Sequence, residues 1–87
     1  MDLAKERIDI LEAALAARRR EVMHYQINID NFRASIALIQ REHMDNEDMR
    51  QYAAELAQLL ASTEAQQARE KISLRVLEEQ LGIDHVG

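Results

Sequence analysis

The chain has 87 residues, no cysteine and no proline, and its 16 acidic and 11 basic side chains give a net charge of −5. This length predicts one domain, the lack of cysteine excludes disulfides and thiolate metal sites, and the charge disfavours nucleic acid as a partner. The first residues lack the features of a signal peptide, and no segment approaches the ~20 apolar residues that span a bilayer. We therefore expect a cytoplasmic protein without a membrane partner.

Residues 2–43 are predicted to form one long helix, with Asp2 as its N-cap. A heptad repeat runs through this segment, so one face of the helix recurs every seven residues. Nine of the ten positions on that face are apolar or aromatic, and Arg18 is the exception. The ten positions are Ile8, Leu11, Leu15, Arg18, Val22, Tyr25, Ile29, Phe32, Ile36 and Ile39. The pattern predicts that this helix packs against another helix.

A break is expected at about residues 43–47, because the apolar phase slips there and Asp45 offers an N-cap before an acidic first turn. The alternative is one unbroken helix through the whole chain. A second helix is predicted at about 46–81, with Gly82 as its stop and 82–87 as a frayed tail. The expected fold is all-α: a single-domain, antiparallel two-helix hairpin that resembles a coiled coil.

The second helix is expected to carry two kinds of apolar residue. Large side chains cluster near its two ends: Met49, Tyr52, Leu56, Leu59 and Leu60 near the turn, and Leu74, Leu77 and Leu81 near the other end. Smaller ones recur at spacings of three and four between them: Ala57, Ala61, Ala65, Ala68, Ile72 and Val76. We call these six the alanine ridge. We expect it to face the middle of the first helix, whose larger side chains would fill the space.

The first helix also has apolar residues outside its heptad face. They include Ile10, Met23, Ile27, Ala34 and Leu38. A helix that is apolar over most of its circumference is buried by more than one neighbour. We therefore predict a second interface, through which two hairpins pair into a homodimeric four-helix bundle or a heterologous protein binds.

The candidate partner-binding residues lie around the middle of the first helix. They are Arg19, Arg20, Met23, His24, Ile27, Asn28 and Asn31. The run Arg18-Arg19-Arg20 fans over about 200° of a helix, with Arg18 directed into the heptad face. One interpretation is that Arg18 pairs with a glutamate of the second helix. The other is that the run binds an anion, an acidic partner or nucleic acid, with help from His24 and Tyr25.

Nothing in the sequence favours catalysis, so no enzyme activity, catalytic residue or cofactor is expected. Glu21 and His24 have the E-x-x-H spacing of carboxylate metal sites in helical bundles, but they lie beside and behind the heptad face, where ligands do not converge. No metal site is therefore predicted. The few serine and threonine hydroxyls have no histidine–carboxylate pair within helical reach.

Residues 23–33 (MHYQINIDNFR) and 76–81 (VLEEQL), together with the acidic, cysteine-free and all-helical layout, resemble small accessory proteins of tailed bacteriophages. Many of those proteins bind a host protein and disable or redirect it. The resemblance implies a non-catalytic protein-binding module, such as a stoichiometric inhibitor or adaptor. The alternatives are a self-assembling structural scaffold, and an oligomeric binder of an anionic ligand or nucleic acid through Arg18–Arg20.

Overall fold

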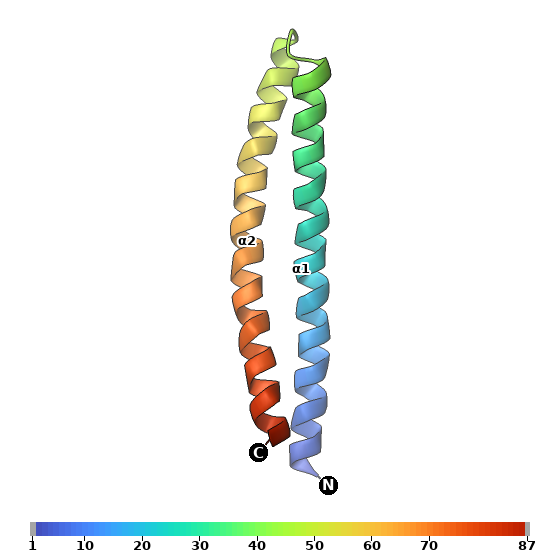
Figure 1. Cartoon of the computed structure of the whole chain (residues 1–87), viewed down its shortest axis with the longest axis vertical. Helices are drawn as coiled ribbons and strands as arrows, with labels where there is room; N and C mark the ends of the chain where they lie inside the picture. The colour runs from blue at the N-terminus through green and yellow to red at the C-terminus, as the bar shows by residue number, and fades with distance from the viewer. Residues whose placement is uncertain (1, 87) are drawn as a thin grey trace.

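The structure, a computed structural model that describes residues 2–86, contains two long α-helices. Helix α1 spans Leu3–Glu42 and helix α2 spans Glu47–Val86. They lie side by side and antiparallel, so the two ends of the chain meet at one end of the molecule (Figure 1). The predicted all-α hairpin is confirmed, and the single unbroken helix is excluded.

The hairpin is a thin rod that measures 66 × 15 × 15 Å. Its radius of gyration is 19.4 Å, whereas a globular domain of this length would have about 12 Å. Each helix has only one neighbour, so burial is confined to the line where they touch. The buried apolar side chains are Leu15, Ile29, Ile39 and Leu56.

Helix α1 begins at the expected cap. The Asp2 carboxylate accepts hydrogen bonds from the backbone N–H groups of Ala4 and Lys5, at 3.1 and 3.2 Å. These bonds satisfy two of the donors that the first turn of a helix leaves unpaired. The helix continues for 40 residues because no proline or glycine interrupts it.

The turn lies where it was expected, but its capping residue differs. Asn46, and not Asp45, caps α2: its side-chain oxygen accepts the N–H of Met49 at 3.1 Å. The N–H of Asn46 donates to the carbonyl of His43, also at 3.1 Å, which closes the turn. Asp45 lies within this turn, so its backbone is one residue too early to cap the helix.

Helix α2 runs past the expected stop at Gly82 and ends at Val86. One glycine costs a helix only about 1 kcal/mol, and two neighbouring contacts offset that cost. Leu81 is half-buried in the interface, and the Asp84 carboxylate pairs with the Arg7 guanidinium of α1. Residues 82–86 are therefore helical, not a frayed tail, and residue 87 lies outside the described residues.

The contact line between the helices, which we call the seam, uses the predicted heptad face of α1. Three of its ten residues are buried, six are half-buried, and only Arg18 is exposed. The opposing face of α2 follows an equally regular heptad. The buried or half-buried residues at its heptad positions are Ala53, Leu56, Leu60, Thr63, Gln67, Glu70, Leu74, Leu77, Leu81 and Asp84, and Ser73 beside them is also half-buried.

The predicted role of the alanine ridge is wrong, because all six of its residues are exposed. The seam residues of α2 recur in one heptad pattern from Leu56 to Leu81, so the same side of the helix faces α1 along its whole length. To bring the ridge into the middle of the seam, the helix would have to twist once after the first leucine cluster and twist back before the second. The ridge recurs mostly every fourth residue, so it drifts around the helix and crosses its back. Tyr52 and Leu59, which belong to the predicted cluster of large apolar side chains near the turn, are also about half exposed.

Candidate binding surface

The middle of the seam is polar on the α2 side. Gln67 is only 7% exposed. Its side-chain amide donates to the backbone carbonyl of Val22 at 3.2 Å and to the side-chain oxygen of Gln26 at 2.9 Å. These bonds satisfy the buried amide, and no buried side-chain polar atom in residues 2–84 lacks a partner. The heptad spacing of the flanking leucines could have predicted that Gln67 faces α1.

Ion pairs flank this polar layer. Arg18 donates to the Glu70 carboxylate at 2.8 Å, as one interpretation of the arginine run predicted, and Arg33 lies 3.4 Å from Glu64. The Arg18 side chain is 46% exposed, so water screens the pair. Such pairs add less than about 1 kcal/mol each to stability. Their directional hydrogen bonds favour one relative position of the two helices.

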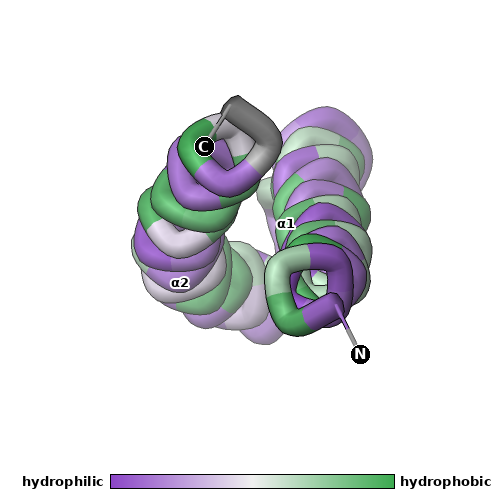
Figure 2. The backbone as a smooth tube through the Cα atoms, turned by 90° about the horizontal axis from the view of Figure 1, so that it is seen from below, coloured by the Kyte–Doolittle hydropathy of each residue, from purple (hydrophilic) through white to green (hydrophobic). Residues whose placement is uncertain are grey.

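The face of α1 that points away from α2 is unusually apolar. In each heptad three positions are farthest from the seam, and over residues 9–41 nine of these fifteen outward positions are apolar. The nine are Ile10, Ala13, Ala16, Ala17, Met23, Ile27, Ala34, Ala37 and Leu38. Outward positions of a helix in water are normally polar or charged. Hydrophobic segments are visible on the outer sides of the tubes as well as between them (Figure 2).

The large side chains on this outward face of α1 are well exposed. Ile10, Met23, Ile27 and Leu38 keep between 42% and 63% of their surface accessible. Isolated apolar residues on a surface need no explanation, but a row along one helix indicates an interaction site. The predicted second apolar surface of α1 is thus exposed in the hairpin.

All seven predicted partner-binding residues are exposed on α1, but they do not share one face. By helical phase, five lie on the outward face: Arg20, Met23, His24, Ile27 and Asn31. Arg19 and Asn28 lie at its two opposite edges. Since Arg18 is engaged with Glu70 and Arg19 points to one side, the arginine run presents no single basic patch.

Sequence reasoning left out several members of this surface. The outward alanines at 13 and 16 and the outward charges Asp9, Asp30 and Arg41 were not among the candidates. The signal that connects them is a second heptad: Ala13, Arg20, Ile27, Ala34 and Arg41 recur every seven residues, as do Asp9, Ala16, Met23, Asp30 and Ala37. This second repeat was hidden by the stronger one that forms the seam.

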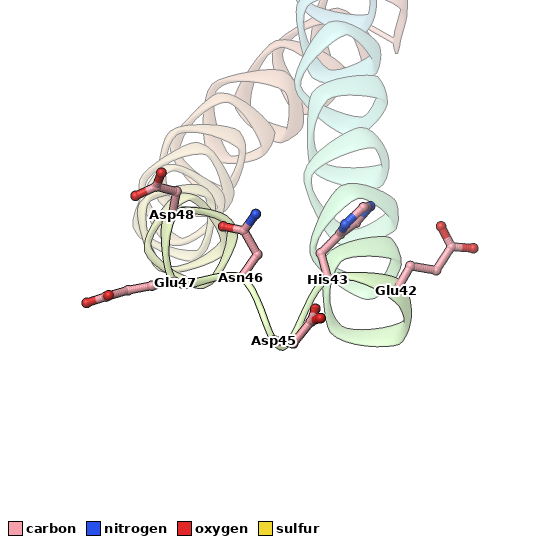
Figure 3. Close-up of a pocket in the computed structure, with 6 residues that line it drawn as sticks. All are labelled: Glu42, His43, Asp45, Asn46, Glu47 and Asp48. Atoms are coloured by element: carbon pink, nitrogen blue, oxygen red, sulfur yellow. The ribbon is translucent and has the colours of Figure 1, made fainter.

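The turn forms the most acidic part of the molecule. A hollow there is lined by Glu42, His43, Asp45, Asn46, Glu47 and Asp48. In Figure 3 the carboxylates of Glu42 and Glu47 point in opposite directions, away from the hollow. Among the side chains that the structure describes, within residues 2–84, no group of three or more His, Asp or Glu is arranged to hold a metal ion. Glu21 and His24 are both exposed and belong to no such group.

In the part of the chain that the structure describes, neither helix is long and apolar enough to cross a membrane. No protein-family description, curated protein or solved structure matches this chain. The exposed apolar row on the outward face of α1 is the feature that indicates a binding function.

Proposed function

We propose that this protein is a non-catalytic protein-binding module, which acts by covering part of another protein's surface as an inhibitor or adaptor. The observation that carries the proposal is the exposed apolar row on the outward face of α1. Its centre combines Met23 and Ile27 with the polar side chains of Arg20, His24 and Asn31. An apolar centre with a polar border is the usual composition of a protein interface.

The rod shape supports this mode of action. A helix face about 50 Å long, spanning the residues from Asp9 to Arg41, offers anchors at the spacing that fits a groove or another helix. The seam stays intact when such a face is used, because the outward and inward residues of α1 do not overlap. The chain lacks cysteine, and we propose that it works in the reducing cytoplasm.

We further propose that two hairpins associate into a homodimer of four helices through this side of α1. Because this side faces away from α2, the two α1 helices pack at the centre and the α2 helices lie outside them, in place of the expected compact four-helix bundle. The small number of buried residues supports self-association, since a two-helix seam with four buried apolar side chains gives little stability alone. A purely structural scaffold would instead form large homo-oligomers and bind no other protein. Sedimentation of the purified chain distinguishes a homodimer from such a scaffold.

The test of partner binding is quantitative affinity capture from the lysate of the cell that naturally produces the protein. Wild type is compared with Met23→Glu/Ile27→Glu on α1 and with Ile72→Glu/Val76→Glu on α2. Both pairs replace exposed apolar residues one helical turn apart with the same charge, so the second is a matched control. We expect wild type and the α2 variant to retain the same protein, and the α1 variant to lose it. Equal retention by all three, or no retention, would contradict the proposal.

A further inference from the structure

The outward face of α1 has a charge pattern that fits a second copy of itself in one orientation. We propose that two α1 helices pack back to back and antiparallel, about a two-fold axis at the level of Tyr25. The inference rests on the proposed function, because it assigns a second copy of the chain as the occupant of the binding face when no partner protein covers it. It goes further by fixing the orientation, the register and the residues in contact.

The pairing follows from the second heptad. An axis at the level of Tyr25 places each outward residue opposite the one equally far along the other helix in the opposite direction. Met23 then lies opposite Ile27 of the second copy, and Arg20 lies opposite its Asp30. At the two ends of the interface, Asp9 lies opposite Arg41. All of these positions alternate at spacings of three and four, which is the geometry of an antiparallel coiled coil.

The layers between these pairs contain only alanine. Ala13 lies opposite Ala37 of the second copy, and Ala16 lies opposite its Ala34. Facing alanines allow two helix axes to approach closely. On one flank of this row, Ile10 comes beside Leu38 of the second copy, which covers two more exposed apolar side chains. On the other flank, Arg19 approaches Arg33, whose charge is balanced by Glu64 in its own hairpin.

The charges exclude the competing arrangements. A parallel pair would place Arg20 against Arg20 and Asp30 against Asp30, so like charges would meet along the whole interface. An antiparallel pair shifted by one heptad would place Arg20 opposite Met23 or Ala37 and would bury Asp30 without a cation. In the proposed register every outward charge meets one of opposite sign. Arg20 makes no ion pair within the described residues of its own chain, so it is available for this contact.

The amount of exposed surface fits the same conclusion. The hairpin exposes 6559 Å², whereas a compact monomer of 10.0 kDa exposes about 5,200 Å². The excess of about 1,300 Å² is larger than the roughly 800 Å² that each partner contributes to a standard protein interface. The surface that each hairpin would bury against a second copy is therefore smaller than its excess over a compact monomer.

The register is tested by disulfide formation, which the absence of native cysteine makes clean. Ala16→Cys and Ala34→Cys are prepared as two single variants, both at exposed positions. When they are mixed and oxidised, we expect a disulfide-linked heterodimer, whereas neither variant alone should form a linked dimer. Rapid linkage of Ala16→Cys to itself would mean a parallel pair. That result, or a mixture that gives no linked dimer, would overturn the proposal.

A charge exchange gives an independent readout that does not depend on oxidation. Arg20→Asp creates two repulsive contacts with Asp30 and should weaken the dimer by about tenfold or more, measured by sedimentation equilibrium. Arg20→Asp/Asp30→Arg restores opposite charges and should return the dissociation constant close to that of wild type. The same exchange on α2, Arg75→Glu/Glu79→Arg, is the control and should leave it unchanged. A double variant as weak as the single one would overturn the register.

The outcome separates this inference from the proposed function, because purified protein alone is used. A wild-type chain that sediments as a monomer at 100 µM, roughly 1,000-fold above a typical tight dissociation constant, would remove the dimer. Loss of partner capture by the α1 variant would still support the binding module. A dimer with the expected linkage, together with no captured partner, would leave self-assembly as the role of this face.

Discussion

The two ends of the seam hold the helices together through apolar contacts, whereas the middle of the seam does so through hydrogen bonds and an ion pair. Near the turn, Ile39 and Leu56 are buried between apolar neighbours, and near the termini Leu15 lies at the level of Leu74 and Leu77. In the middle, α2 offers Thr63, Gln67 and Glu70, of which Gln67 donates to Val22 and Gln26 of α1 and Glu70 pairs with Arg18. The ends therefore supply the hydrophobic stabilisation, whereas the middle contributes directional bonds.

This difference indicates what each part does for the fold. Apolar contacts are not directional and tolerate a sliding of one helix along the other. A buried amide does not tolerate such sliding, because a shift would break the hydrogen bonds of the Gln67 side chain to Val22 and Gln26. We infer that the middle of the seam fixes the register that the ends stabilise.

The largest effect is expected at an apolar end. Leu56→Ala removes a side chain that is 4% exposed and should lower the free energy of unfolding by about 3 kcal/mol. Urea unfolding followed by circular dichroism at a fixed protein concentration measures it. The matched control is Leu59→Ala, which truncates a leucine that is 51% exposed and should cost about 0.5 kcal/mol or less. Equal losses for the two leucines would contradict the placement of the seam.

A smaller effect is expected in the middle. Gln67→Ala removes both hydrogen bonds across the seam and should cost about 1–2 kcal/mol. Gln67→Leu, which restores the volume without the amide, should be as stable as wild type or more so, because Gln26 can turn to water. If Gln67→Leu were instead as unstable as Gln67→Ala, the hydrogen bonds themselves would carry the stability. That result would reverse the assignment of roles to the middle and the ends.

The smallest effect is expected at the border of the polar layer. A double-mutant cycle with Arg18→Ala and Glu70→Ala should give a coupling energy of about 0.2–1 kcal/mol, because the Arg18 side chain is half exposed. The coupling should decrease when salt is raised from low to molar concentration. A coupling above about 2 kcal/mol would mean that the pair is desolvated in solution, contrary to the observed exposure.

Much of the architecture could be read from residue spacing. The heptad of α1, the cap at Asp2, the turn near 43–47 and the pairing of Arg18 with a glutamate were all predicted, and the structure confirms them. Each depends on short-range rules, namely the periodicity of the helix, the preference for capping oxygens and the compatibility of charge. These rules act within one helix or between one charge and its opposite.

The orientation of α2 was not predictable in the same way. Its sequence offers two faces, one with leucines interrupted by Thr63, Gln67 and Glu70, and one with alanines that continue without a polar residue. Composition favoured the alanines for the middle of the seam, and the structure places them outside. A straight helix presents the same side to its neighbour along its whole length, so only one of the two faces of α2 can meet α1. Burial of the leucines at both ends stabilises the structure more than burial of the alanines in the middle would.

The sequence by itself determined that this chain forms two helices with a turn between them, because helix propensity, caps and the heptad of α1 are local properties. Only the tertiary structure decided which face of α2 meets α1, that Gln67 is buried and that α2 continues through Gly82. Those outcomes depend on contacts between residues more than 40 positions apart, such as Gln67 with Val22 and Arg7 with Asp84. Because a helix is rigid, the energies of these contacts sum along its whole length. Their sum can outweigh the conformation or orientation that any single segment would favour.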